Sequence, residues 1–284
     1  MENMQAELHL RQHMLRENYE IFHFQGKNGA QIALHFHDFY ECSLLISGAL
    51  SYQIESASFA EQPGDLLLIG PNQLHRPLFI HGTEPYERIV FWLSRPFVER
   101  LSGPGADLSG CFSSGRTSAI RLSGALRAQV TRSLFELLSA GKAEQFGKDV
   151  LCRSLAASLL VLLNRISLGE TAELPNADLR ISPLVQRVSA YLDEHLGEDV
   201  TLDELSRTVF LSKYYLERRF KRETGVSIYR MLLQKRMIRA RNLMREGMSL
   251  TNVAQSCGFS EYSGFYKAFR SEYGVSPRAY QRQF

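Results

Sequence analysis

The sequence predicts an α+β protein of two domains: an N-terminal β-barrel with flanking helices, and an all-α C-terminal domain with two helix-turn-helix motifs. Short runs rich in β-branched and aromatic residues, separated by turn residues, occupy residues 19–95. Beyond them, apolar residues recur at helical spacing. A length of 284 residues, with 44% hydrophobic and 22% charged residues, suits a soluble globular protein of one or two domains.

The C-terminal domain contains an internal repeat: the same supersecondary unit occurs in Leu202–Ser227 and in Leu250–Ser276. Phe220 of the first copy aligns with Phe269 of the second once a single inserted residue is allowed for. Each copy predicts a short helix, a tight turn and a longer helix with a basic and aromatic exposed face. This arrangement is typical of a helix-turn-helix.

Charge is divided unevenly along the chain. The net charge is +3, but residues from 177 onward carry 18 Lys and Arg against 12 Asp and Glu, whereas residues 1–176 carry 15 against 18. A basic surplus on the duplicated unit favours double-stranded DNA as a partner. We expect a cytoplasmic protein without a membrane span, because no run of about 18 uninterrupted apolar residues occurs and the four cysteines are scattered.

The N-terminal barrel is expected to contain roughly eight short strands. The clearest runs are YEIFHFQ, AQIALHFH, ECSLLIS, LSYQIES, LLLIG, RPLFI and ERIVFWL. Asn28-Gly29, between the first two runs, is a strong signal for a two-residue hairpin. Pro63-Gly64-Asp65 predicts a further turn.

Two histidine-containing motifs lie within these runs. The first is His35-x-His37 followed by Glu41, and the second ends at His75. Imidazoles at positions i and i+2 of a strand point to the same face, and three His with one carboxylate suit a divalent transition metal. Both spacings resemble the two cupin motifs, whose residues converge on a metal inside the barrel of cupin enzymes.

Three interpretations of His35, His37, Glu41 and His75 remain open. They bind a divalent metal, or they hydrogen-bond an organic ligand, or they are retained in a sensor barrel that has no working metal site. The second motif departs from the cupin pattern at Gly70, which favours the sensor.

Residues 96–168 predict two amphipathic helices, over Ile120–Leu138 and Phe146–Ile166. The second is apolar over a wide arc, as a helix needs if one face packs on the barrel and another on a partner subunit. We therefore expect a homodimer formed through it. The predicted organisation is an N-terminal arm (residues 1–18), the barrel (19–95), the helical dimerisation region (96–168), a linker (169–179) and the C-terminal domain (180–284).

Capping signals divide the C-terminal domain into helices. Thr201 with Glu204 predicts a capping box. Further N-caps are predicted at Ser182, Ser212, Ser227, Ser249, Ser260 and Ser276. A long helix from Ile228 to about Glu246 joins the two copies. We expect its basic residues to face DNA phosphates or to pair with acids such as Glu204 and Glu223.

Long, spaced motifs cover this domain. They are LSKYYLERRFKRETGVS, Arg236-x-x-x-Ala240-x-x-Leu243-Met244, Val253-Ala254-x-x-x-Gly258-Phe259 and Phe265-x-x-x-Phe269-x-x-x-Tyr273-Gly274-x-Ser276-Pro277-x-x-Tyr280. The stretch resembles the DNA-binding domain of the AraC/XylS family of transcription regulators, which commonly carry a cupin-like sensor barrel in front. One departure is Phe210, in a turn where a small residue is common.

The two longer helices present the candidate DNA-binding residues. Their outward positions are Lys213, Tyr214, Glu217, Arg218 and Lys221 in the first copy, and Tyr262, Ser263, Tyr266 and Lys267 in the second. Tyr214, Glu217 and Arg218 match Ser263, Tyr266 and Lys267, and these six resemble the base-contacting positions of the family. We expect Lys213, Lys221 and Lys267 to contact either bases or phosphates. The planar fork of Arg218 suits guanine O6 and N7, and we expect the first copy to discriminate sequence more than the second.

The resemblance implies a dimeric transcription regulator with a small-molecule effector in the barrel. Because members of the family commonly activate transcription, it also implies an activator with RNA polymerase as a further partner. Two alternatives stay open: a metal-binding cupin enzyme fused to a DNA-binding domain, and a regulator controlled by a protein partner. We expect no enzyme, because the sequence supports neither a nucleophile–histidine arrangement nor a Gly-rich phosphate loop.

Overall fold

The computed structural model describes residues 14–26, 32, 34–55, 57–78, 85–113, 119–122, 124–170 and 180–282. The chain divides into two compact units, residues 1–180 and residues 181–284. Each unit is described by itself.

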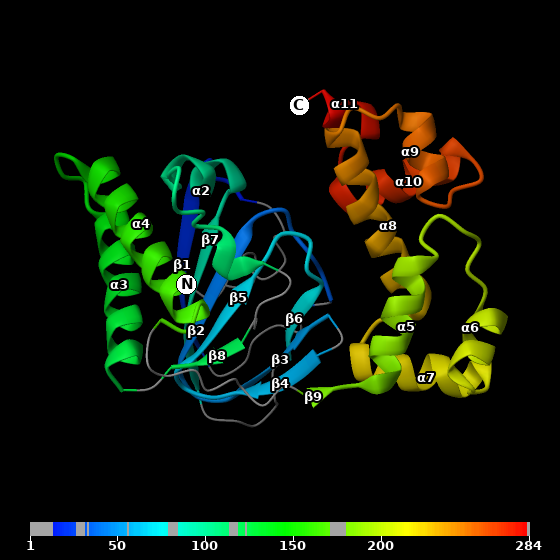
Figure 1. Ribbon diagram of the computed structural model, residues 1–284, viewed down its shortest axis with the longest axis horizontal. Helices are drawn as coiled ribbons and strands as arrows, with labels where there is room; N and C mark the ends of the chain where they lie inside the picture. The colour runs from blue at the N-terminus through cyan, green and yellow to red at the C-terminus, as the bar shows by residue number, and fades with distance from the viewer. Residues whose placement is uncertain are drawn as a thin grey trace. The chain divides into compact units, whose positions relative to one another are not determined.

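The N-terminal unit contains two antiparallel sheets (Figure 1). The first has the strand order β1 (Tyr19–Gly26), β7 (Tyr86–Leu93), β2 (Tyr40–Ser47), β5 (Asp65–Ile69) and β8 (Ala119–Arg121). The second contains β6 (His75–Leu78), β3 (Leu50–Ile54) and β4 (Ala57–Glu61) in that order. Apolar side chains of β3, β4 and β5 share one core between the sheets, so the predicted cupin-like fold class is confirmed.

Strand β1 pairs with β7. The ladder extends from Tyr19 opposite Leu93 to Gly26 opposite Tyr86. The predicted turn at Asn28-Gly29 lies outside the described residues, so the hairpin stays a prediction. Within the described part of the second run, residues 32 and 34–37, His35 makes a β-bridge to His75.

Helices cover the outer face of the five-stranded sheet. They are α2 (Arg95–Leu101), the 3-10 turn η1 (Gly110–Phe112), α3 (Gly124–Lys142) and α4 (Lys148–Ser167). Figure 1 shows α3 and α4 side by side on this face. Outward-facing strand residues such as Cys42 and Phe91 share a core with Leu134 of α3 and Leu160 of α4. Helix α4 is long and apolar enough to cross a membrane by length and composition, and one of its faces packs in this core.

The C-terminal unit is helical. Its elements are α5 (Pro183–Glu194), α6 (Leu202–Val209), α7 (Lys213–Thr224), α8 (Ile228–Arg245), α9 (Leu250–Ser256), α10 (Tyr262–Tyr273) and α11 (Pro277–Gln281), after the two-residue strand β9 (Arg180–Ile181). The predicted capping box at Thr201 and Glu204 is present. The other predicted caps form except at Ser260: α10 is preceded by Glu261, which makes no side-chain capping bond. The residue inserted in the second copy lengthens this turn.

Two cations of α8 pair with acids inside the unit, which is one of the two roles predicted for this helix. Arg230 pairs with Glu272 at 2.8 Å, and Lys235 pairs with Asp193 at 2.7 Å. Neither predicted acid, Glu204 or Glu223, is used by these two. A central helix is enclosed by its neighbours, so its charged side chains must be paired or hydrogen-bonded.

Phe210 adopts a left-handed conformation, with φ 57° and ψ 42°, at the end of α6, and its side chain is 87% exposed. This conformation costs a residue with a Cβ about 1–2 kcal/mol. We expect Phe210→Gly to stabilise the C-terminal unit by about 1 kcal/mol, measured as a higher urea midpoint of the helical circular dichroism signal. Phe210→Ala keeps the Cβ and should give no such gain. An equal gain from both substitutions would contradict the backbone explanation.

Candidate functional site

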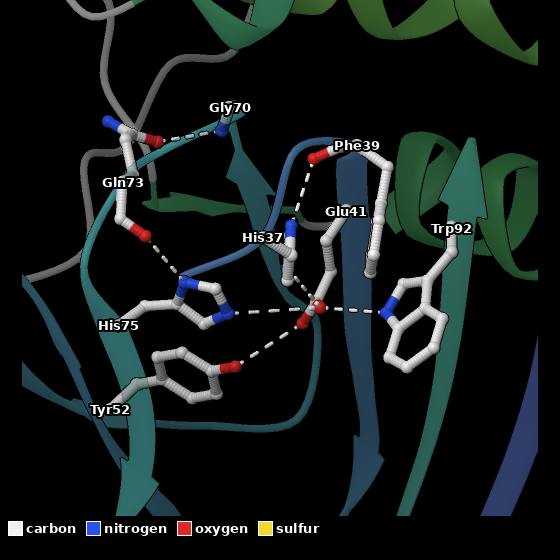
Figure 2. A network of polar contacts seen from close by, with 8 residues as sticks. All are labelled: His37, Phe39, Glu41, Tyr52, Gly70, Gln73, His75 and Trp92. Atoms are coloured by element: carbon white, nitrogen blue, oxygen red, sulfur yellow. Dashed lines mark hydrogen bonds and ion pairs between the residues drawn. The ribbon is translucent and has the colours of Figure 1, made fainter. Parts of the chain in front are cut away.

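A buried polar network, here called the Glu41 network, lies inside the barrel (Figure 2). Glu41 Oε2 accepts a hydrogen bond from Trp92 Nε1 at 2.8 Å, and Glu41 Oε1 accepts one from the Tyr52 hydroxyl at 3.3 Å. The Nε2 atoms of His37 and His75 lie 3.2 Å and 3.9 Å from Glu41 Oε2. Glu41 stands opposite Trp92 in the β2–β7 ladder, so the register of adjacent strands brings these two side chains together.

The backbone fixes the tautomers of both histidines. His37 Nδ1 lies 3.0 Å from the carbonyl oxygen of Phe39, and His75 Nδ1 lies 2.8 Å from that of Gln73. A carbonyl oxygen only accepts, so each Nδ1 carries the proton. The Gln73 side chain in turn accepts a hydrogen bond from the backbone N–H of Gly70 at 2.7 Å. Both Nε2 atoms therefore turn toward Glu41.

Electrostatics keep Glu41 charged and His75 neutral. Burial raises the pKa of Glu41, but the His37 hydrogen bond and the nearby charge of Arg88 outweigh it and hold the pKa well below its usual range. Burial, with His35 and His37 beside it, lowers the pKa of His75 well below its ordinary value. His75 Nε2 thus offers a lone pair, and among the described residues it has no hydrogen-bond partner.

Three of the four predicted metal-ligating residues converge. The ligand atoms of His37, Glu41 and His75 lie within 4.8 Å of one another. The lone pair of His75 Nε2, one carboxylate, and His37 Nε2 once it gives up the proton that it donates to Glu41, form a donor set that fits a divalent transition metal, with both Nδ1–H groups tied to backbone carbonyls. His35 is not in this group; its ring lies beside that of His75, with centroids 4.3 Å apart. The polar roles of Tyr52 and Trp92 could not be predicted from the motifs, although strand alternation predicts the face on which they lie.

Helix α7 displays all five residues predicted to read DNA in the first copy. Leu216 and Phe220 are buried, whereas the five predicted residues, Lys213, Tyr214, Glu217, Arg218 and Lys221, are exposed. The ammonium group of Lys213 pairs with Asp203 at 2.5 Å. Exposed ion pairs of this kind are weak, so the lysine can exchange its partner for phosphate.

Helix α10 buries Phe265 and Phe269 in the same way. Of its predicted DNA-contacting residues, Tyr262, Ser263 and Lys267 are exposed, whereas Tyr266 is half-buried. The Ser263 hydroxyl donates a hydrogen bond to Glu261 at 3.2 Å. The second face is therefore less accessible than the first.

Comparison with known proteins assigns both units. Residues 17–160 match the AraC-like ligand binding domain, and residues 205–283 match a helix-turn-helix domain. The chain belongs to the AraC family. It is a transcription regulator with an N-terminal ligand-binding domain and a C-terminal DNA-binding domain.

Several proteins are similar to this AraC-family chain. It is 29% identical to the transcriptional activator RhaS of Salmonella schwarzengrund (strain CVM19633) over 86% of this chain and 85% of RhaS. It is 27% identical to LumQ of Photobacterium leiognathi over 87% of this chain and 91% of LumQ. The DNA-binding domain of AdpA, solved in complex with a target DNA, is 31% identical over 36% of this chain and 92% of that chain, with a TM-score of 0.34.

Proposed function

We propose that this AraC-family regulator is a cytoplasmic homodimer that activates transcription through RNA polymerase, and that its effector is a small molecule bound at the Glu41 network. The observation that carries the proposal is a buried, polar and incompletely satisfied network in a ligand-binding domain. A buried lone pair such as that of His75 Nε2 is costly without a partner. Binding can regulate only if the effector prefers one arrangement of the chain over another.

Fluorescence anisotropy with fragments of candidate promoters tests the DNA-binding part of this proposal. We expect one fragment to bind at least about 10³-fold more tightly than a scrambled duplex at physiological salt. A Glu41→Ala protein should bind the same fragment but lose any response to the effector. Equal affinity for all duplexes would contradict sequence-specific regulation.

A divalent transition metal is a second occupant that the Glu41 network supports. His37, Glu41 and His75 would hold it, and it would supply Lewis acidity and open positions for a ligand. We expect tag-free protein to bind about one zinc or iron per chain by plasma mass spectrometry, and His37→Ala to reduce this by at least about tenfold, because one of three ligands is lost. His23→Ala is the matched control, since His23 pairs with Glu87 on the outer sheet edge. Wild-type protein that remains metal-free after incubation with either ion would contradict a metal site.

Turnover of a substrate by the metal-loaded protein would favour the alternative of a cupin enzyme fused to a DNA-binding domain.

Helix α4 is the proposed dimer contact. Phe146, Val150 and Leu151 are exposed around its first turns. Phe146 and Leu151 line a groove between α3 and α4, together with Ala140 and Leu155. We expect Val150→Glu with Leu151→Glu to raise the dimer dissociation constant at least about 100-fold, because two carboxylates would be desolvated at the interface. Sedimentation equilibrium measures this. Leu168→Glu, at the exposed far end of the helix, is the control, and a dimer unaffected by the double substitution would refute the contact.

A further inference from the structure

The barrel contains a second cluster of polar side chains: Ser43 on β2, Glu61 on β4 and Arg88 on β7. Ser43 follows Glu41 by two residues, so both point to the inner face. Arg88 shares its strand face with Trp92, and Glu61 shares its face with Phe59, which belongs to the core between the sheets. Relative exposures of 1%, 2% and 4% place all three, here called the inner cluster, inside the protein.

Two members of the inner cluster lack the hydrogen bonds that buried polar atoms require. The hydroxyl of Ser43 and both carboxyl oxygens of Glu61 have no partner among the residues that the structure describes. Buried side-chain polar atoms in folded proteins are nearly always satisfied. Glu41, by comparison, is held by Trp92 and Tyr52. The exceptions therefore indicate atoms that are satisfied by a ligand.

The charges around the inner cluster favour an acceptor-rich ligand. Burial raises the pKa of Glu61 to about 8; Arg88 opposes this rise, while Asp65 and Glu41 add to it. Tyr52, also facing Glu61, is a neutral phenol whose pKa burial raises well above its usual value. At neutral pH Glu61 is thus a protonated acid that can donate, within the electrostatic reach of Arg88. Ser43 is opposite Val90 in the β2–β7 ladder, so it is a diagonal neighbour of Arg88 on the same face.

We propose that Ser43, Glu61 and Arg88 bind the carboxylate of a small organic acid. This inference rests on the proposed function of the barrel as the effector-binding domain. The guanidinium supplies the charge, and the two hydroxyl groups donate to the carboxylate oxygens. The apolar body of the acid packs on the aromatic side chains of the same interior, Phe22, Phe24, Phe39, Tyr86 and Trp92. A cation is disfavoured by Arg88, whose guanidinium already stands 5.1 Å from the centroid of the Phe24 ring.

Isothermal titration of the full-length protein with benzoate, phenylacetate and cinnamate, and with their neutral amides, tests the proposal. We expect at least one carboxylate to bind and its amide to bind at least about tenfold more weakly, because the amide loses the charge-assisted contacts. Ser43→Ala, a small change in a buried strand, should weaken the carboxylate by about tenfold. Arg88→Met should weaken it further, while Glu99→Gln, exposed on α2, should change nothing.

The pH dependence isolates the role of Glu61. Because the protonated acid binds the carboxylate, affinity should fall as pH rises through about 8, the pKa of Glu61. Glu61→Gln keeps a neutral donor and should bind the carboxylate with an affinity that no longer falls above pH 8. Amides binding as well as acids, no acid binding at all, or wild-type affinity in Ser43→Ala would overturn the inference. Promoter binding is measured in parallel. If only the carboxylate site is wrong, the protein still binds its promoter, whereas loss of promoter binding indicates a failure of the proposed regulatory function.

Discussion

Gly258→Ala is expected to destabilise the C-terminal unit by about 2–5 kcal/mol and to abolish DNA binding. Gly258 has φ +73°, and a Cβ there would lie 2.5 Å from a terminal guanidinium nitrogen of Arg236 and 2.8 Å from the carbonyl oxygen of Leu196. The guanidinium of Arg236 donates to the carbonyls of Leu196, at 3.1 Å, and Glu198, at 2.6 Å. Displacing it adds the cost of unsatisfied buried groups, about 1–3 kcal/mol, to left-handed strain of about 1–2 kcal/mol.

Gly274→Ala is the matched control for this prediction. Gly274 has the same φ, +73°, but nothing lies within 4 Å of its added Cβ. It should therefore lose only the backbone contribution of about 1–2 kcal/mol and keep most DNA binding. Native-state hydrogen exchange of α8, α9 and α10 in the full-length protein measures both changes. Equal effects of the two substitutions would show that Arg236 does not join these helices in the way described.

Replacing Glu217 and Arg218 by alanine is expected to relax sequence preference more than replacing Tyr266 and Lys267. Arg218 is exposed on α7, and no ion pair within the described residues engages it, whereas Tyr266 on α10 is half-buried. A bidentate arginine–guanine contact discriminates by about 1–3 kcal/mol. Loss of Glu217 and Arg218 should therefore reduce discrimination between bases at one or two positions of the site by about 5- to 100-fold.

Lys221→Ala alone should lower affinity for all duplexes alike, because Lys221 is outside the matched base-contacting positions and a phosphate contact carries no sequence information. Anisotropy titrations against duplexes with single-base changes, at one fixed salt concentration, distinguish the two classes of effect. Lys142→Ala, in the last turn of α3, is a charge-matched control in the N-terminal unit. Greater loss of discrimination from the α10 substitutions would reverse the assignment.

Local signals in the sequence located the C-terminal helices well. The capping box at Thr201 and the serine caps act over three residues, so they can be read without knowing the fold. Gly258 marked its turn in the same way. The cap at Ser260 was wrong because the inserted residue moved the helix start by one position. The roles of Arg230 and Lys235 could not be predicted, since their acidic partners lie about forty residues away or more.

Non-local contacts limited the prediction of the barrel. The cupin spacing identified His37, Glu41 and His75, which the structure brings together. The pairing of β1 with β7, a strand about sixty residues later, could not be predicted, because alternation marks a strand without specifying its partner. The inner cluster was missed, because Glu61 stands at the end of a run, ASFAE, that is too short and polar to predict a buried strand.

Selection of bound sites from a random pool of double-stranded DNA by the full-length protein tests the central claim most directly. Helix α8 joins the two helix-turn-helix units and, with 18 residues at about 1.5 Å each, is about 27 Å long. We therefore expect α7 and α10 to enter successive major grooves about 10 base pairs apart. If both helix-turn-helix units read DNA, the consensus has two elements at this spacing. Arg218→Ala should then remove the conserved guanine from one element only. A consensus with a single element, or one that Arg218→Ala leaves unchanged, would contradict it.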